Sequence, residues 1–427
     1  MKRACISAFM LLSVASAQNT LRLTLAEAER LAIANHPQLS AAQLNAAAAS
    51  QVPLELHANF EPVLSGALTG VGADAGSRLA AGALNNPVVY NRIGTGLLLN
   101  QLVTDFGRTG SLVDSAKFHA QAQDQVTEAT RAQILLTVNR AYFGALRAEA
   151  VLKVAQQTVS ARQLVADQVA TLARSNLKST LDVSFANVNL ADAKLLLASA
   201  QSNVQSAYAD LATAIGLPGQ YAQGGFSLAP EPLPDALPDK VDSLINDAVR
   251  DRPELQGLRL EENAAQRFAQ AEKDLKLPTV SVAATAGFAP VANVQVPARY
   301  GAIGVNVSIP IFNGHLYRNR QTEAELRAKA ADQNVNDLAN RVVRDVRIAY
   351  LSASTAFDRL ALTAQLLDQA RLALDLAQRR YDLGLGSIVE LSQAQLNVTS
   401  AEIAGSSAQF DYQSLRASLS YQIGALR

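Results

Sequence analysis

The sequence predicts a mainly α-helical fold that also contributes strands to a membrane β-barrel, and three features of the chain support this prediction. Two helical patterns, over 107–173 and 316–382, have apolar residues at alternating spacings of three and four, as coiled coils do. Four segments have strand lengths, and the last two alternate apolar with small or polar residues over about ten residues, as membrane strands do, whereas the first two alternate less cleanly. The order of elements then occurs twice. We therefore expect a duplicated order of helix, strand, strand, long helix and return helix.

The chain opens with a segment, over 1–17, that is typical of a secretory signal peptide. Lys2 and Arg3 precede an apolar run, and residues 15–17 (Ala-Ser-Ala) provide a small-x-small cleavage site. The run is too short to span a bilayer as a helix. Cys5, the only cysteine, lies within the run rather than at the cleavage site, which disfavours a lipid anchor. We expect an exported chain without disulfide bonds.

The charge balance gives no indication of a nucleic-acid partner. The sequence has 37 basic and 37 acidic residues, and removal of the leader leaves a net charge of about −2. No other apolar run approaches the roughly 18 residues that a transmembrane helix needs. Any membrane-spanning part must therefore consist of strands.

The first copy is expected over 18–217 and opens with a helix over 24–51, which His36-Pro37 interrupts because proline lacks a backbone N–H. Strands over 60–71 and 93–103 follow, and helices over 107–173 and 180–215 complete this copy. An extended linker is predicted over 218–239 from Pro218, Pro230, Pro232, Pro234 and Pro238.

The second copy is expected over 240–427. Its helix over 240–276 is interrupted at Arg252-Pro253, its strands lie over 279–289 and 301–312, and its long helices lie over 316–382 and 387–423. Matching residues are 208 positions apart, among them Ala141 and Ala349, Asn189 and Asn397, and Gly216 and Gly424. This constant spacing indicates an internal duplication.

Each long helix is predicted to end in a tight turn and to run back as a hairpin. In the second copy Gly384 and Gly386 tolerate the positive φ at which helices end. Ser387 and Glu390 are then spaced as a capping box that begins the return helix, and Ser179 with Asp182 matches them 208 residues earlier. We expect the hairpin twice, although the two copies are not equivalent, since Ala173 stands where the second copy has Tyr381.

One face of each strand is predicted to contact lipid. In 301–312 the apolar residues are Ile303, Val305, Val307, Ile309 and Ile311, and in 279–289 they are Val280, Val282, Ala284, Ala286 and Phe288. Aromatic residues lie near strand ends, where membrane barrels have interfacial girdles, at Phe60, Tyr90, Phe288, Tyr300 and Phe312. A soluble two-sided sheet is the alternative.

The number of strands predicts an oligomer. In lipid every backbone polar group must be paired, and four strands cannot close a barrel. Several copies of the chain must therefore share one barrel in a cyclic homo-oligomer.

Three motifs follow one another in a fixed order. They are Leu25-Ala26-Glu27-Ala28 with His36-Pro37, then Pro310-Ile311-Phe312-Asn313-Gly314 before a long helix, and then Tyr381, Gly384 and Ser387-Ile388-Val389-Glu390 followed by Ala394-Gln395. With the duplicated order, they resemble the outer-membrane efflux channels of the TolC type over essentially the whole mature chain. The resemblance implies a homotrimer in the outer membrane, with four strands per chain in one twelve-stranded barrel and a helical coiled-coil tunnel in the periplasm. It also implies passive conduction, with a periplasmic adaptor and an inner-membrane pump as partners.

The resemblance further implies a gate at the periplasmic tips of the hairpins. Glu390 stands where the family has an entrance Asp, whereas Gln393 stands where a second acid is common. Tyr381 and Asp182 match residues that join neighbouring hairpins in the closed state, and Gly386 stands where some members have an Arg. Helix capping is the simpler role for Asp182 and Glu390, and a seam position is the simpler role for Tyr381.

The sequence contains no motif of an enzyme. It has no G-x-S-x-G elbow, phosphate loop or H-E-x-x-H pair, and its four histidines are scattered. We therefore expect no catalytic activity, cofactor or metal site. Two alternatives to an efflux duct are the outer-membrane channel of a type I protein-secretion system and a secreted structural coiled-coil protein. The cargo itself does not follow from the sequence.

Overall fold

The computed structural model of the protein describes residues 21–74, 76–77, 90–217, 226–238, 240–291 and 297–426, so the expected leader over 1–17 lies outside the described residues. The chain divides into two compact units. The first unit comprises 1–37, 131–242 and 346–427, and the second comprises 38–130 and 243–345. Both units therefore combine segments from both halves of the chain.

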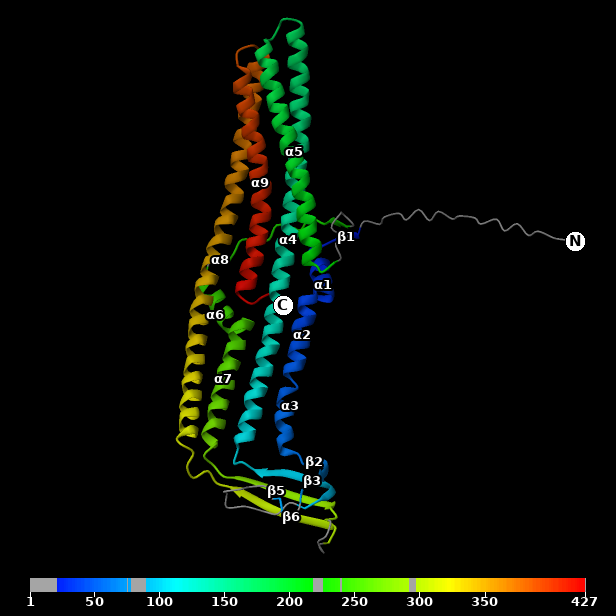
Figure 1. Cartoon of the computed structure of the whole chain (residues 1–427). Helices are drawn as coiled ribbons and strands as arrows, with labels where there is room; N and C mark the ends of the chain where they lie inside the picture. Colours follow the sequence, from blue (N-terminus) through cyan, green and yellow to red (C-terminus); the bar gives the residue numbers. More distant parts are fainter. Residues whose placement is uncertain are drawn as a thin grey trace, which may run out of the picture. The chain divides into compact units, whose positions relative to one another are not determined.

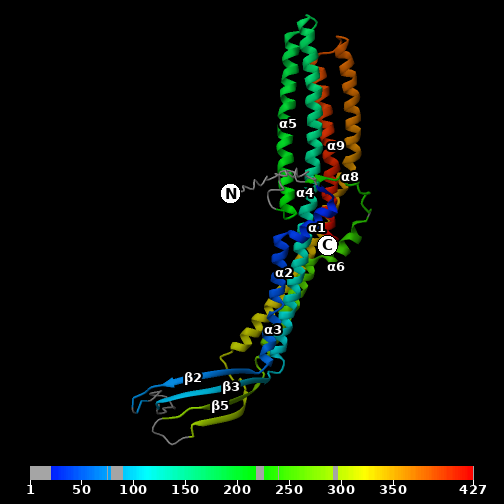
Figure 2. The same cartoon turned by 90° about the vertical axis from the view of Figure 1, so that its right-hand side faces the viewer.

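Two helix hairpins form most of the first unit (Figures 1 and 2). Helix α4 (Arg108–Arg174) is followed by α5 (Thr180–Ala214), and α8 (Leu316–Asp382) is followed by α9 (Ile388–Gln422). Helices α4 and α8 have 67 residues each, α5 and α9 have 35 each, and matching helices begin 208 residues apart. Buried seam alanines, among them Ala145, Ala155 and Ala353, allow the helices to pack closely. Over the described residues, no helix is both long enough and apolar enough to cross a membrane.

The linker expected over 218–239 contains a strand. The structure pairs β1 (Leu21–Leu23) in parallel with β4 (Phe226–Leu228). The hydroxyl of Tyr142 in α4 lies 3.0 Å from the carbonyl oxygen of Leu23 and 2.5 Å from that of Ala229. The described part of the linker is thus held to the first unit by backbone pairing and by a buried tyrosine, a long-range contact that proline content alone does not indicate.

Prolines divide the shorter helices. The helix expected over 24–51 is two helices, α1 (Leu25–Asn35) and α2 (Pro37–Ala49). A further helix, α3 (Val52–His57), and a short 3-10 helix, η1 (Ala58–Phe60), follow. The helix expected over 240–276 is two, α6 (Val241–Asp251) and α7 (Pro253–Asp274). His36 and Arg252 have extended backbones because the proline ring disfavours the α conformation in the residue before it.

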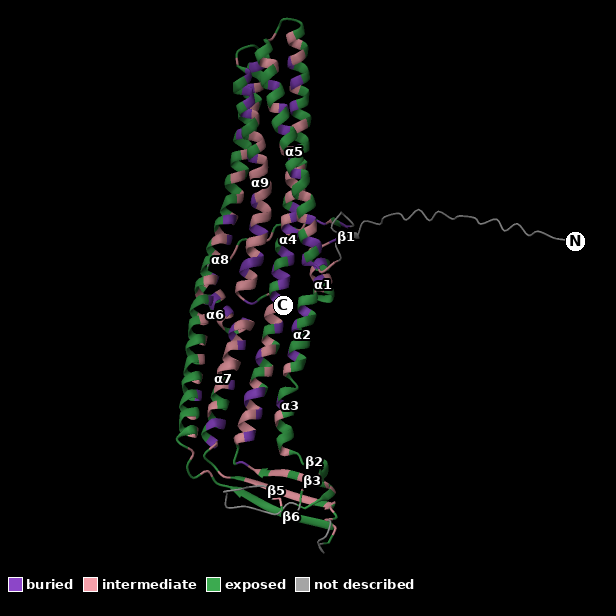
Figure 3. Ribbon diagram, viewed as in Figure 1, coloured by how far each residue is buried: buried purple, intermediate pink, exposed green. Residues whose placement is uncertain are grey.

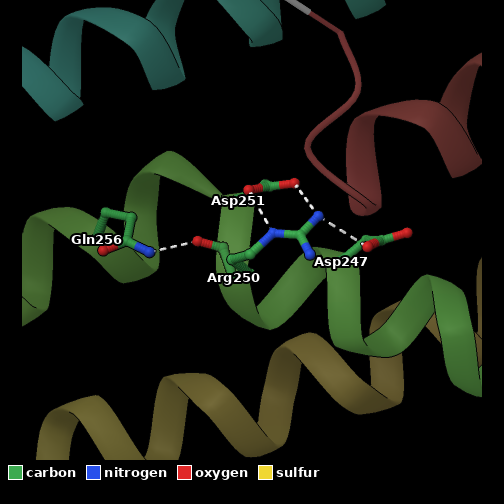
Figure 4. Close-up of polar contacts among 4 residues, drawn as sticks. All are labelled: Asp247, Arg250, Asp251 and Gln256. Carbon is green, nitrogen blue, oxygen red and sulfur yellow. Dashed lines mark hydrogen bonds and ion pairs between the residues drawn. The ribbon is translucent and has the colours of Figure 1, made fainter.

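A polar network spans the break between α6 and α7 (Figure 4). Arg250 donates hydrogen bonds to Asp247 at 2.8 Å and to the two oxygens of Asp251 at 3.0 and 2.9 Å. Gln256 of α7 donates to the carbonyl oxygen of Arg250. The hydrogen bond and charge of Asp251, and then the charge of Asp247, raise the pKa of Arg250 above its usual value. Because the guanidinium is exposed, this network orients the local chain and adds little stability.

A four-stranded antiparallel sheet with the order β2-β3-β5-β6 belongs to the second unit (Figures 1 and 2). Its strands are β2 (Val63–Val71), β3 (Arg92–Thr104), β5 (Thr279–Phe288) and β6 (Arg299–Ser308). Strand β2 begins later than the expected residue 60 because η1 ends at Phe60. Strand β6 ends before residue 312 because Pro310 has no N–H for the ladder.

The register gives this sheet two different faces. Residues directly opposite each other on neighbouring strands point to the same side. One side has large apolar residues, namely Leu64, Leu68, Leu97, Leu99, Val282, Ile303, Val305 and Val307. The other has mainly small or polar residues, among them Ser65, Ala67, Gly96, Asn100, Ala283, Thr285, Gly304 and Asn306, and it also has Leu98 and Leu102. None of the strand residues is buried, as the colours of Figure 3 show, so the apolar side is uncovered.

Candidate functional site

The two hairpin turns of the first unit, over 175–179 and 383–387, lie at the same end of that unit (Figures 1 and 2). A residue with positive φ ends each long helix, Asn176 (56°) in the first turn and Gly384 (72°) in the second. The next N–H returns to the last helical turn, from Leu177 to Leu172 O at 2.9 Å and from Leu385 to Arg380 O at 2.8 Å. The two turns therefore share one backbone conformation.

The first turn begins its return helix with a complete capping box. The Ser179 hydroxyl accepts a hydrogen bond from the N–H of Asp182 at 3.1 Å. The Asp182 carboxylate accepts from the N–H of Ser179 at 3.1 Å and from its hydroxyl at 3.0 Å. This reciprocal pair satisfies two N–H groups that have no partner inside the helix.

The second turn forms only half of the expected box. The Ser387 hydroxyl accepts from the N–H of Glu390 at 3.1 Å, as predicted. The Glu390 carboxylate instead forms an ion pair with Arg380, whose Nε lies 3.1 Å from Oε1. Arg380 also donates to the carbonyl oxygen of Leu385 at 3.2 Å. The full box predicted at Ser387 and Glu390 is thus wrong, because an arginine ten residues earlier competes for the carboxylate.

Gly386 does not have the positive φ expected for both glycines of this turn. Of the two glycines in this turn, Gly384 has a positive φ and Gly386 does not. A Cβ on Gly386 would instead lie 3.2 Å from the Cβ of Arg380 and 3.3 Å from a carboxylate oxygen of Glu390. Gly386 therefore provides space for the ion pair between these two residues.

Tyr381 lies at the contact between the two hairpins. Its side chain is 5% exposed and belongs to a cluster that draws on all four helices of the hairpins, namely Ala166, Val169, Ala186, Leu190, Tyr381, Ile388 and Leu391. The matching residue of the first copy is Ala173. Only the second hairpin therefore contributes a large ring to this contact.

Lys178 of the first turn reaches this ring, and the sequence interpretation missed it. Its Nζ lies 3.8 Å from the centroid of the Tyr381 ring and 3.4 Å from the carbonyl oxygen of Tyr381. A cation over an aromatic face is attracted by the ring quadrupole. Lys178 matches Gly386 in the other copy, so the spacing of 208 residues, applied position by position, indicates an unequal pair of residues here.

The Tyr381 hydroxyl is buried, and it has no hydrogen-bond partner within the described part of the chain. Burial raises the pKa of this hydroxyl above its usual value, and the negative charges of Asp182 and Asp382 add to the increase. Asp182 thus acts on the ring across the hairpin contact while it caps its own helix. No hydrogen bond joins the Tyr381 hydroxyl to Asp182 within the described residues.

The side chains of Glu390 and Gln393 interact with residues of the second hairpin. Glu390 is held by Arg380, and the Gln393 amide donates to Asn397 on the same helix at 3.0 Å. Both residues are exposed. They lie close in sequence to the turn, but their side chains take no part in the contact between Tyr381 and Lys178.

A surface pocket of about 530 Å³ lies beside Tyr381. It is lined by Val165, Asp167, Gln168, Val169, Thr171, Leu172, Gln378, Tyr381 and Asp382. Two carboxylates in this lining fall short of a metal site, and the described residues contain no group of three histidine, cysteine or acidic side chains that could hold a metal ion.

Comparison with protein families gives a match along both halves of the chain. The family described as outer membrane efflux protein matches residues 29–217 and 244–425. The outer membrane protein TolC of Salmonella enteritidis is 22% identical over 351 residues, which cover 80% of this chain and 71% of that protein. The alkaline protease secretion protein AprF of Pseudomonas aeruginosa is 24% identical over 329 residues, which cover 75% of this chain and 65% of that protein.

Solved structures share the same fold. The outer-membrane channel OprN superposes with a TM-score of 0.82 at 19% identity, covering 94% of this chain and 90% of that one. The outer membrane protein VceC from Vibrio cholerae superposes with a TM-score of 0.81 at 20% identity, covering 94% of this chain and 96% of that one.

Proposed function

This chain belongs to the outer membrane efflux protein family, and from that premise we propose that it is the exit duct of a tripartite efflux system. It is an outer-membrane channel protein that extends into the periplasm, and its family consists of ducts rather than enzymes. In the proposed system an inner-membrane pump and a periplasmic adaptor deliver cargo, which the duct conducts passively. Family membership sets aside the alternative of a secreted structural coiled-coil protein.

One observation is the main support for the duct, namely a sheet with an uncovered apolar face and two edges. Strands β2 and β6 each have one neighbour within the described residues. Because every neighbouring pair is antiparallel, β2 and β6 run in opposite directions. Strand β6 of one copy can therefore pair with β2 of the next copy without a parallel contact.

We propose that three copies, the number that the family resemblance implies, close one twelve-stranded barrel. Closure pairs every edge N–H and C=O, which a bilayer requires, and it presents the apolar face to outer-membrane lipid. In detergent we expect a trimer whose electrophoretic migration changes on heating. A monomer with its strands intact would contradict the barrel.

In the proposed duct, the hairpin turns form the gate. Tyr381 and Asp182 hold neighbouring hairpins together, Lys178 stabilises the ring, and Glu390 and Gln393 lie at the rim. The buried Tyr381 ring supports this assignment, because it packs in a cluster that draws on both hairpins of the chain.

The gate is tested with the double variant Tyr381→Phe and Asp182→Ala. Phenylalanine keeps the ring and removes the hydroxyl, while alanine removes the acid and the cap. We expect a higher mean single-channel conductance in a planar bilayer. Tyr350→Phe with Asp358→Ala makes the same chemical changes on α8 away from the turns and should leave the conductance unchanged. Equal conductance in the test variant and the parent protein would rule out the gate assignment.

Protein secretion is the second candidate function, because the chain is also similar to a protease secretion protein. The two candidates differ in the adaptor that meets the hairpin tips. Leu177 and Leu385 are exposed in the two turns, so photo-crosslinkable residues at these positions should reach it. An adaptor of a drug or metal pump supports efflux, and one that serves a protein exporter supports secretion.

A further inference from the structure

A tyrosine lies across two glycines on the polar face of the sheet, far along the chain from the proposed gate. Gly96 of β3, Gly287 of β5 and Tyr300 of β6 lie opposite one another in the register and form one row. A Cβ on Gly96 would overlap the hydroxyl oxygen of Tyr300, and a Cβ on Gly287 would overlap the same ring. The ring therefore lies flat over both strands, in a slot that exists because neither glycine has a side chain.

The register also decides which side of the sheet Tyr300 occupies. Tyr300 shares its face with Gly304 and Asn306, whereas Ile303 and Val305 are on the apolar face. The sequence grouped Tyr300 with aromatic residues of a lipid-facing girdle, and the register contradicts that grouping. If the apolar face meets lipid, Tyr300 faces the interior of the barrel.

Tyr300 also lies at one end of the sheet. It is the second residue of β6, and the other end of β6 leads toward α8. Its side chain is 44% exposed, as expected for a ring with one face against glycine backbone and the other face open. In a cyclic trimer, three such rings lie at one level of the lumen, at the end of the sheet away from the helices.

We propose that the slot formed by Gly96 and Gly287 holds the Tyr300 ring against the wall and so preserves the width of the lumen at this level. The proposal rests on the proposed function, since a lumen exists only if the sheet closes into a barrel. With the rings in their slots the lumen keeps its full width. A ring that is displaced from its slot projects from the wall and narrows the lumen.

Gly96→Ala is the sharpest test. The first atom that its new methyl group meets is the far end of the Tyr300 side chain, and the next two, Ala286 O and Tyr300 Cζ, are each 3.2 Å away. The ring should therefore move more readily than the backbone. The size limit is measured with graded polyethylene glycols, added on the barrel side of single channels in a planar bilayer. We expect the largest polymer that enters to fall roughly twofold in mass.

Gly304→Ala is the matched control. Gly304 is on the same face of β6, and a Cβ there would meet no atom within 4 Å, so the limit should not change. Adding Tyr300→Ala to Gly96→Ala should restore the limit of the parent protein. A Gly96→Ala trimer with an unchanged limit overturns the proposal.

If Gly96→Ala does not assemble, Tyr300→Ala alone tests whether the Tyr300 ring lies against the wall. A ring already against the wall obstructs little, so its removal should leave the polymer limit nearly unchanged. A marked increase would place the ring in the open lumen and overturn the proposal.

Failure of the barrel is recognised separately, with cysteines on opposite faces of β6. Ala302→Cys should react with an aqueous, membrane-impermeant thiol reagent, and Ile303→Cys in lipid should not. Equal reaction of both overturns the barrel together with the proposal for Tyr300. Selective reaction of Ala302→Cys, with no effect of Gly96→Ala, overturns the proposal for Tyr300 alone.

Discussion

The first and second hairpin turns have the same backbone but different side-chain contacts. A left-handed residue ends the long helix in both, Asn176 in one and Gly384 in the other. Asp182 completes a capping box in the first turn, whereas Glu390 forms an ion pair with Arg380 in the second. The first turn contributes a lysine to the contact between hairpins, and the second contributes a tyrosine.

This difference shows how a duplicated hairpin can form a specific contact with its own copy. Lys178 of the first copy lies over the Tyr381 ring of the second, whereas the matching residues are Gly386 and Ala173. Backbone geometry was retained while the contacting side chains became complementary. In the proposed trimer the six tips therefore alternate between two kinds.

Lys178→Met should have the largest effect on this complementarity. Methionine keeps an unbranched chain but removes the charge from the face of the Tyr381 ring, which should cost about 1–2 kcal/mol. We expect a roughly tenfold increase in the open fraction of single channels. Lys178→Arg retains the cation and should behave like the parent protein. If Lys178→Met matches Lys178→Arg, the charge does not stabilise the contact.

The helices, the strands and the positions of the turns could be predicted from local patterns. Heptad spacing indicates the long helices, and alternation indicates β5 and β6. Proline explains the breaks at His36 and Arg252 because its effect acts on the neighbouring residue. The pairing of β1 with β4 could not be predicted, since it joins short segments about 200 residues apart whose pairing depends on the surrounding helices.

The site could be predicted only in part, for a related reason. Tyr381 and Asp182 are identified as candidates through the family resemblance, which matches them to residues beside the turns. The contact of Lys178 depends on how the hairpins pack, and the ion pair of Glu390 depends on the direction of the Arg380 side chain. A capping-box pattern describes four consecutive residues and gives no information about a competing cation ten residues earlier.

The capping residues of the two hairpin turns should differ in their contribution to stability, with a smaller effect than that of Lys178→Met. Ser179→Ala removes the hydroxyl that takes part in two hydrogen bonds with Asp182, so it should cost about 1 kcal/mol of local stability. Ser387→Ala removes one hydrogen bond to Glu390 and should cost roughly half as much. Hydrogen exchange of amides in the first turns of α5 and α9 measures both, with Ser184→Ala as an exposed control on α5. Equal acceleration in the two turns would contradict the difference between them.

Arg380→Leu should have the smallest effect, and it converts the second turn toward the first, where Leu172 is the matching residue. An exposed ion pair contributes about 0–1 kcal/mol, so its loss is small. The Glu390 carboxylate is then free to accept from the N–H of Ser387, as Asp182 does from Ser179, and this hydrogen bond offsets part of the loss. We therefore expect slower hydrogen exchange at the Ser387 amide and less dependence of exchange on salt concentration, because screening weakens the ion pair of the parent protein. Arg380→Lys keeps a cation and should retain the salt dependence. If the Ser387 amide exchanges faster in Arg380→Leu, the two turns differ for a reason other than competition for the carboxylate.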